Sequence, residues 1–245
     1  MIYIVLGMHK SGTTLLSTML HKSGINMGEG FSVGTYDTGN QYERDEVYQL
    51  NLKLLGSKDD QTLKLKAPAN WMLSVSEKNE MQEVVDCCEE KYEGIDWGAK
   101  EPRTCLTYKL WQEVLPKHKV IGIFRRPEQI WPRYRWKGWR RRYVNLYWAW
   151  LFLNRWYEYN EGLIDAVNEN ESIVIEYQEF MTDGALLDQL SVFTGRKLLD
   201  ERRASMHRSK KGYDAPLFIA KYLLLIFKGR SVDRLIDRLY SAKAG

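Results

Sequence analysis

The chain has 245 residues, of which 44% are hydrophobic and 13% aromatic. Such a chain can bury enough apolar surface to offset its ordering entropy, which excludes wholesale disorder, and its length suits one domain with a sizeable core. Its formal net charge of +4, from 36 Lys and Arg against 32 Asp and Glu, is too small to indicate a nucleic-acid partner. The positive excess is local, because residues 125–142 contain eight Lys or Arg and a single acid, Glu128.

The cysteine and histidine content argues against disulfides and metal sites. The three cysteines, Cys87, Cys88 and Cys105, have no CxxC spacing, and the four histidines form no ligand pattern. The N-terminal residues lack the features of a secretion signal, and the apolar segment 215–227 is shorter than the roughly 20 residues that span a bilayer. We therefore expect a reduced, soluble, cytoplasmic protein with no bound metal and no transmembrane segment.

Hydrophobic periodicity predicts strands and helices that alternate along the chain. The predicted strands are 2–6, 119–124 and 172–177, and the predicted helices are 13–22, 44–55, 76–92, 104–116, 143–167 and 183–194, followed by a helical C-terminal part. This alternation predicts an α/β fold with a central parallel sheet flanked by helices on both faces. We expect a single domain over 1–245, with an α/β core over about 1–200 and a helical C-terminal segment over 201–245.

The first predicted strand leads into an anion-binding loop. Gly7 to Thr14 read GMHKSGTT, and Gly7 and Gly12 have the GxxxxG spacing of a P-loop between a strand and a helix. A nucleotide kinase places its lysine directly after the second glycine, where this chain has Thr13, whereas Lys10 lies two positions before that glycine. The predicted fold is therefore P-loop-like, and the displaced lysine favours an anion other than a triphosphate.

This loop resembles the 5′-phosphosulfate loop of sulfotransferases. The resemblance covers six consecutive residues: His9, Lys10, Ser11, Gly12, Thr13 and Thr14. It implies that they bind the donor 3′-phosphoadenosine-5′-phosphosulfate (PAPS), which carries no triphosphate, and that no metal is required. It also implies that Lys10 stabilises the charge that develops on the bridging oxygen as the sulfuryl group leaves.

A second motif follows strand 119–124, at the same edge of the predicted sheet. The segment from Arg125 to Arg133 resembles the R-D-P-x-x-x-x-x-S motif of sulfotransferases, whose Arg and Ser bind the 3′-phosphate of the donor. Arg125 and Pro127 match, whereas Arg126 replaces the Asp and Arg133 replaces the Ser. Because a guanidinium can hold phosphate with two N–H groups, we expect Arg125 and Arg133 to bind this phosphate.

Three further segments support the resemblance, which spans about residues 2–195. Residues 97–104 resemble the W-x-x-K-D-P-R-T stretch of bacterial sulfotransferase-like proteins, and residues 39–43 resemble the glutamate-containing stretch that follows the first helix in that family. Residues 208–212 resemble the R-K-G segment that clamps the 3′-phosphate. The remaining candidates come from these segments and from the basic, aromatic run 125–142: Lys210 and Lys211 for the donor, and Lys100, Arg103, Trp136 and Trp139 for the acceptor.

An acceptor hydroxyl must lose a proton as it attacks sulfur, so a base is required. We expect Glu43, which opens a predicted helix after the glycine-rich loop, to be that base. Glu101 is the alternative, although Arg103 beside it also fits a structural ion pair. His9 is a further neighbour of Lys10, for which a role in shaping the loop is preferred.

The leading hypothesis is a PAPS-dependent sulfotransferase that acts on a hydroxyl or amine of a saccharide, glycolipid or small metabolite, as in carbohydrate sulfation. The alternatives are a nucleotide-dependent kinase and a non-catalytic, sulfotransferase-like module that binds polyanions. Helix 215–228 is expected to be core or a homodimer contact, and its Ile219, Leu223 and Ile226, with lysines nearby, leave peripheral membrane contact open.

Overall fold

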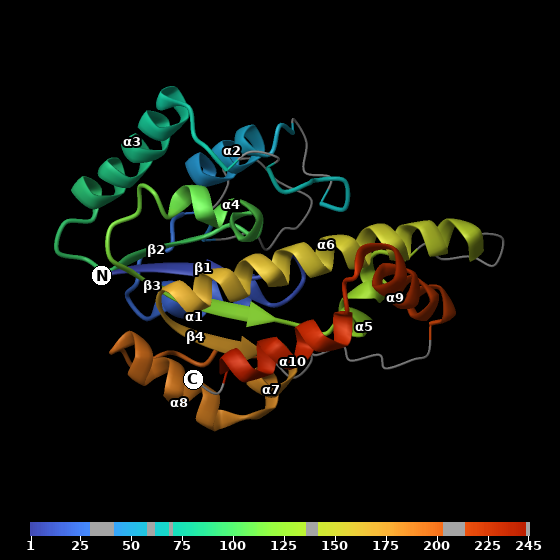
Figure 1. The fold of residues 1–245 in the computed structure, drawn as a ribbon. Coiled ribbons are helices and arrows are strands. Elements are labelled where there is room, and N and C mark those ends of the chain that lie inside the picture. The colour runs from blue at the N-terminus through green and yellow to red at the C-terminus, as the bar shows by residue number, and fades with distance from the viewer. Residues whose placement is uncertain (30–41, 58–61, 69–70, 136–141, 203–213, 244–245) are drawn as a thin grey trace.

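A four-stranded parallel sheet forms the centre of the molecule (Figure 1). The computed structural model describes residues 1–29, 42–57, 62–68, 71–135, 142–202 and 214–243, apart from the side chains of 142–144. The strands lie in the order β2-β1-β3-β4. Their bounds are β1 (Ile2–Leu6), β2 (Trp97–Lys100), β3 (His118–Phe124) and β4 (Glu171–Glu176).

Helices connect and cover the strands. Their bounds are α1 (Thr13–Lys22), α2 (Asp45–Leu54), α3 (Val75–Lys91), α4 (Thr104–Trp111), α5 (Pro127–Ile130), the short 3-10 helix η1 (Trp131–Arg133), α6 (Arg142–Glu169), α7 (Tyr177–Thr182), α8 (Gly184–Thr194), α9 (Ala215–Lys228) and α10 (Val232–Lys243). The alternating side chains of β1 separate two hydrophobic cores, because successive strand residues point to opposite faces. Ile2, Ile4 and Leu6 pack with α3, α4, α6, α9 and α10, whereas Tyr3 and Val5 pack with α1, α7 and α8.

The predicted fold class is confirmed, and the bounds of most elements agree with the sequence prediction. Strand β2 was not predicted, since four residues containing Gly98 and Lys100 show no strand periodicity; its pairing with β1 makes it a strand. Helix α4 begins at Thr104, as predicted, with Arg103 at its N-cap position, and it ends at Trp111 instead of at residue 116. The C-terminal helices α9 and α10 contribute to the larger of the two cores.

The strand order places two loops side by side. Strand β1 pairs with β3, and both run in the same direction, so the loop after Leu6 and the loop after Phe124 leave the same edge of the sheet. The chain moves from β1 to β2 in one direction and from β3 to β4 in the other. Ligands of open α/β sheets bind at this kind of switch point, outside the carboxyl ends of the strands.

Candidate anion-binding and transfer site

The loop between β1 and α1 is shaped to receive an anion. Lys10 and Gly12 both have positive φ, 70° and 106°, and Gly12 is the N-cap of α1 without any side-chain cap. The first turn of α1 also carries no acid. The N–H groups at this end therefore present partial positive charge to an incoming anion.

Two glycines let this loop approach its neighbours closely. A Cβ on Gly7 would lie 2.4 Å from the carbonyl oxygen of Ile123, and one on Gly12 would lie 2.3 Å from the ring of Tyr177. Ser11 closes the loop by donating from Oγ to the Met8 carbonyl at 2.6 Å. The GxxxxG spacing is thus required by packing as well as by backbone conformation.

Arg125 lies directly beside this loop. Its guanidinium carbon is 4.5 Å from the centre of the Tyr177 ring, and Nη1 donates to the Lys10 carbonyl at 3.5 Å. Gln129 accepts from Nε at 3.2 Å, and the indole N–H of Trp156 on α6 donates to the Arg125 carbonyl at 2.9 Å. Arg125 is therefore held from both its side chain and its backbone, at the position predicted for it.

Arg126 and Arg133, the two residues that differ from the R-D-P-x-x-x-x-x-S motif, have different environments. Arg126 is exposed and turns toward α10, where Nε lies 3.4 Å from the hydroxyl of Tyr240. Arg133 is also exposed but lies near Arg125: burial lowers the pKa of Arg125, and the positive charge of Arg133 lowers it further. Two guanidinium groups that repel each other beside an anion-binding loop are the arrangement that a phosphate would stabilise.

Glu43 and Lys100 form a buried pair at the start of α1. Lys100 Nζ contacts Glu43 Oε1, and their side chains are 0% and 5% exposed. Lys100 Nζ also donates to Thr14 Oγ1 at 3.4 Å. Lys100 therefore connects the loop that carries Lys10 to the candidate base, instead of extending into solvent toward an acceptor.

Both carboxylate oxygens of Glu101, the alternative base, accept hydrogen bonds. Its Oε1 accepts from Arg103 Nη1 at 2.5 Å, and its Oε2 accepts from Asn51 Nδ2 at 2.7 Å and from the Arg103 backbone at 3.0 Å. Burial raises the pKa of Glu101, with Arg103 opposing the shift. The Arg103 guanidinium also stacks 5.0 Å from the centre of the Tyr48 ring. Both residues form a structural ion pair in this arrangement.

His9 is packed between cations and an aromatic ring. Its ring lies edge-on to Tyr159, with centroids 5.9 Å apart, and its Nδ1 is buried without a hydrogen bond. Burial and the charges of Arg103, Lys100 and Lys10 lower the pKa of His9 well below 6.5. The imidazole is therefore neutral at pH 7, as a residue that shapes the loop can be.

Four of the predicted binding residues, Trp136, Trp139, Lys210 and Lys211, lie outside the described residues. Of the part that the structure describes, no cluster of three or more His, Cys, Asp or Glu could hold a metal, and the three cysteines are free. No described helix has both the length and the apolar character that crossing a membrane demands.

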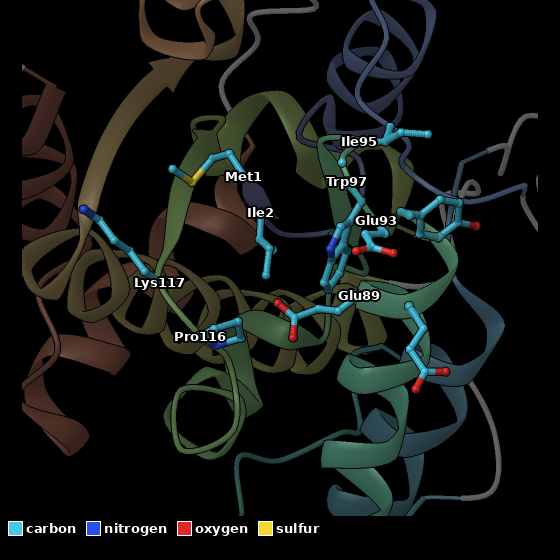
Figure 2. A pocket seen from close by; sticks show the side chains of 11 residues that line it. Met1, Ile2, Glu89, Glu93, Ile95, Trp97, Pro116 and Lys117 are labelled. Atoms are coloured by element: carbon cyan, nitrogen blue, oxygen red, sulfur yellow. The ribbon is translucent and has the colours of Figure 1, made fainter.

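A pocket of about 680 Å³ lies elsewhere, at the amino ends of the strands (Figure 2). Ile2, Trp97 and Lys117 line it from the strand side, and Glu89 and Glu93 line it from the end of α3. Because it opens at the edge opposite to the two loops, this pocket is separate from the anion-binding arrangement.

Sequence reasoning missed two residues of the site region, Tyr177 and Asn51. Tyr177 lies directly after β4, and since β4 pairs in parallel with β3, its position at the edge of the loops could have been inferred from strand order. Asn51 had no comparable signal, because one buried asparagine in a predicted helix looks like any surface asparagine. Its role follows from the packing of α2 against α4.

An α/β sheet with an uncapped helix N-terminus after its first strand, and an arginine after the neighbouring strand, is a P-loop-like arrangement with a candidate anion site. The family model described as "Sulfotransferase family" matches residues 3–186. The chain therefore belongs to the sulfotransferase family.

Solved structures of sulfotransferases share the fold at low sequence identity. The sulfotransferase domain from the curacin biosynthetic pathway is 12% identical, with a TM-score of 0.51 and coverage of 99% of this chain and 97% of that one. The sulfotransferase domain from the Synechococcus PCC 7002 olefin synthase is 15% identical, with a TM-score of 0.50 and coverage of 98% and 87%. Sulfotransferase STF1 from Mycobacterium tuberculosis H37Rv is 12% identical, with a TM-score of 0.50 and coverage of 98% and 76%. A comparison with curated proteins gives no match.

Proposed function

We propose that this protein is a PAPS-dependent sulfotransferase. One observation carries the proposal: Arg125, with Arg133 near it, lies against the loop that bears Lys10, at the uncapped N-terminus of α1. These cations and N–H groups fit a donor with two separate anionic ends, a 5′-phosphosulfate and a 3′-phosphate. No acid follows β3 at the place where a kinase would hold Mg²⁺; Arg125 stands there instead.

The donor-binding roles follow from these positions. The loop from His9 to Thr14 holds the 5′-phosphosulfate through backbone N–H groups, hydroxyls and Lys10. Arg125 and Arg133 hold the 3′-phosphate, which neutralises their mutual repulsion. Binding and positioning supply most of the catalysis, as expected for a loose, phosphoryl-like transition state.

The transfer step uses Lys10 and Glu43. The acceptor oxygen forms a bond to sulfur as the bond from sulfur to the bridging phosphate oxygen breaks. Lys10 stabilises the negative charge left on that phosphate, and Glu43 takes the acceptor proton. Glu43 is preferred over Glu101 because its Oε2 makes no hydrogen bond to a described residue, whereas both oxygens of Glu101 are occupied.

The acceptor that we propose is a hydroxyl or amine on a saccharide, glycolipid or small metabolite. The basic and tryptophan-rich sequence 125–142 supports this choice, because aromatic rings pack on sugar rings while Lys and Arg capture anionic groups.

Calorimetry with adenosine 3′,5′-bisphosphate, the donor without its sulfuryl group, tests the proposal. We expect binding that does not depend on Mg²⁺ and that the Lys10→Ala/Arg125→Ala double variant weakens by about 100-fold or more, since each charged hydrogen-bond donor contributes about 1.5–3 kcal/mol. Lys22→Ala, a lysine at the far end of α1 paired with Glu201, is the matched control and should bind normally.

Two results would contradict the proposal. Tighter binding of ATP with Mg²⁺ would support the kinase instead. Binding of adenosine 3′,5′-bisphosphate without sulfuryl transfer from labelled PAPS to any of a panel of sugars, phenols and hydroxylated lipids would support the non-catalytic module.

A further inference from the structure

Helix α9 has two apolar faces, only one of which is packed. Leu217, Ala220 and Leu224 are buried in the larger core. On the outer side, Tyr222 and Phe227 are 62% and 72% exposed. Four more large apolar side chains on α9 are also exposed: Phe218, Ile219, Leu225 and Ile226. A helix at the surface of a water-soluble molecule normally presents polar residues outward, so this face indicates a partner.

Helix α9 and the two residues after it carry charges of one sign, while the acids that pair with them, Glu128, Glu158 and Asp233, lie on neighbouring elements. Residues 215–230 contain Lys221, Lys228 and Arg230 and no Asp or Glu. Lys228 is exposed at the end of the apolar face, with Nζ 5.9 Å from the centre of the Trp150 ring. Arg230 pairs with Glu158 at 3.0 Å. An apolar helix face bordered by an exposed cation suits a surface with an apolar interior and anionic headgroups.

Two ion pairs connect α9 to the segment that follows Arg125. Lys221 pairs with Glu128 of α5 at 2.5 Å, and Arg135, just after η1, pairs with Asp214, the N-cap of α9, at 3.0 Å. Figure 1 shows α9 at the same end of the molecule as α5. A surface that engages α9 would therefore lie close to the loops at the carboxyl edge of the sheet.

We propose that the outer face of α9, formed by Phe218, Ile219, Tyr222, Leu225, Ile226 and Phe227, docks the protein on an anionic lipid surface. The helix is 14 residues or ~21 Å long, shorter than the ~30 Å hydrocarbon core, and its inner face is packed against the protein. It therefore lies flat, with its outer side chains inserted among the headgroups.

A lipid surface fits α9 better than a second copy of the chain. A stable interface between proteins typically uses 20–30 residues on each side, whereas α9 offers six large exposed side chains on one helix. Pairing two copies through α9 would also bring the positively charged Lys228 side chains of both chains into the interface, where α9 supplies no acid to neutralise them. Anionic headgroups supply that balance, and side chains insert into lipid one by one without a matching surface.

Co-sedimentation of the full-length protein with vesicles tests this proposal. The vesicles are pure phosphatidylcholine or phosphatidylcholine with phosphatidylglycerol. We expect at least tenfold tighter binding to the anionic vesicles, and at least a tenfold loss for Leu225→Ser/Phe227→Ser. Val192→Ser, which changes a side chain 82% exposed on α8, is the matched control and should bind as the unchanged protein does.

Charge reversal and oligomeric state complete the test. Lys228→Glu should weaken binding to anionic vesicles and leave the melting temperature unchanged, which keeps the test valid if the double variant folds poorly. Equal sedimentation of the unchanged protein and both variants would overturn the proposal. A dimer in analytical ultracentrifugation that dissociates in Leu225→Ser/Phe227→Ser would overturn it in favour of a second copy. Neither readout uses PAPS, so the docking proposal and the proposed function fail independently.

Discussion

The buried pair of Lys100 and Glu43 shows how much a single contact constrains this site. Transferring these two opposite charges from water into the protein interior costs several kcal/mol of desolvation free energy. Only their mutual attraction and their hydrogen bonds offset that cost. Such a pair is rarely the most stable choice for a core. Its place beside Thr14, at the start of the anion-binding helix, agrees with a role in chemistry.

Glu43→Gln should separate stability from chemistry. The change removes the carboxylate charge that the buried Lys100 contacts, so we expect the free energy of unfolding in urea to fall by about 3–5 kcal/mol. Adding Lys100→Met should restore most of that loss, since the double variant removes both charges of this pair. Sulfuryl transfer should be absent in both variants, while adenosine 3′,5′-bisphosphate still binds. Transfer by the double variant at the normal rate would move the base to Glu101.

At the scale of elements, one side chain joins helices α2 and α4. Asn51 of α2 donates to Glu101 and to Thr104 Oγ1, and its Oδ1 accepts from Thr107 Oγ1 at 2.6 Å and Trp111 Nε1 at 2.8 Å. The side chain is fully buried and uses both its donors and its acceptor. Because Glu43 lies two residues before α2, this connection also determines where the candidate base lies.

Asn51→Ala should therefore destabilise the protein strongly. Removing the amide takes one hydrogen bond from each of Thr107, Trp111 and Glu101. Each buried polar group that stays unsatisfied costs about 1–3 kcal/mol of stability. We expect the free energy of unfolding to fall by about 3 kcal/mol or more. Gln49→Ala, an exposed position on the same helix, should change it by less than about 0.5 kcal/mol. A similar loss for both variants would contradict the proposed role of Asn51.

At the scale of the whole molecule, the net charge of +4 conceals an uneven distribution. Eight of the 36 basic residues fall within 125–142, and Arg125 of this run lies beside the loop that carries Lys10. Histidines are spread more widely. His9, His21 and His118 lie in different parts of the fold, and burial lowers the pKa of each below 6.5.

These histidines predict a loss of stability in mild acid. Each folded-state pKa lies below the unfolded value, so the unfolded chain binds more protons between the two values and stability falls as the pH decreases. The loss begins near pH 6.5 and for His9, whose Nδ1 atom is buried, reaches at most about 1.4 kcal/mol per pH unit. Urea unfolding at pH 7, 6 and 5.5, with His9→Gln for comparison, measures it. A free energy of unfolding that is constant over this range, or the same slope in His9→Gln, would contradict this assignment.

Local sequence patterns were enough to predict much of the fold. Apolar runs and helical periodicity predicted β1, β3, β4 and the main helices, because each element buries one face and its sequence must repeat accordingly. The two glycines of the first loop and the arginine after β3 were equally visible, since each is required by local backbone conformation or by chemistry at a strand end. Strand β2 was missed because its short sequence shows no strand period, and only pairing with β1 defines it.

The sequence by itself determined the α/β fold and the two loops that we propose as the donor site, because these depend on residues close together in the chain. Only the tertiary structure decided that one oxygen of Glu43 has no hydrogen bond to a described residue, where Arg126 lies relative to Arg125, and that α9 leaves one apolar face uncovered. Those facts depend on contacts between residues far apart in the chain. Burial, competing hydrogen bonds and neighbouring charges set them, and each of these exists only after the helices have packed on the sheet.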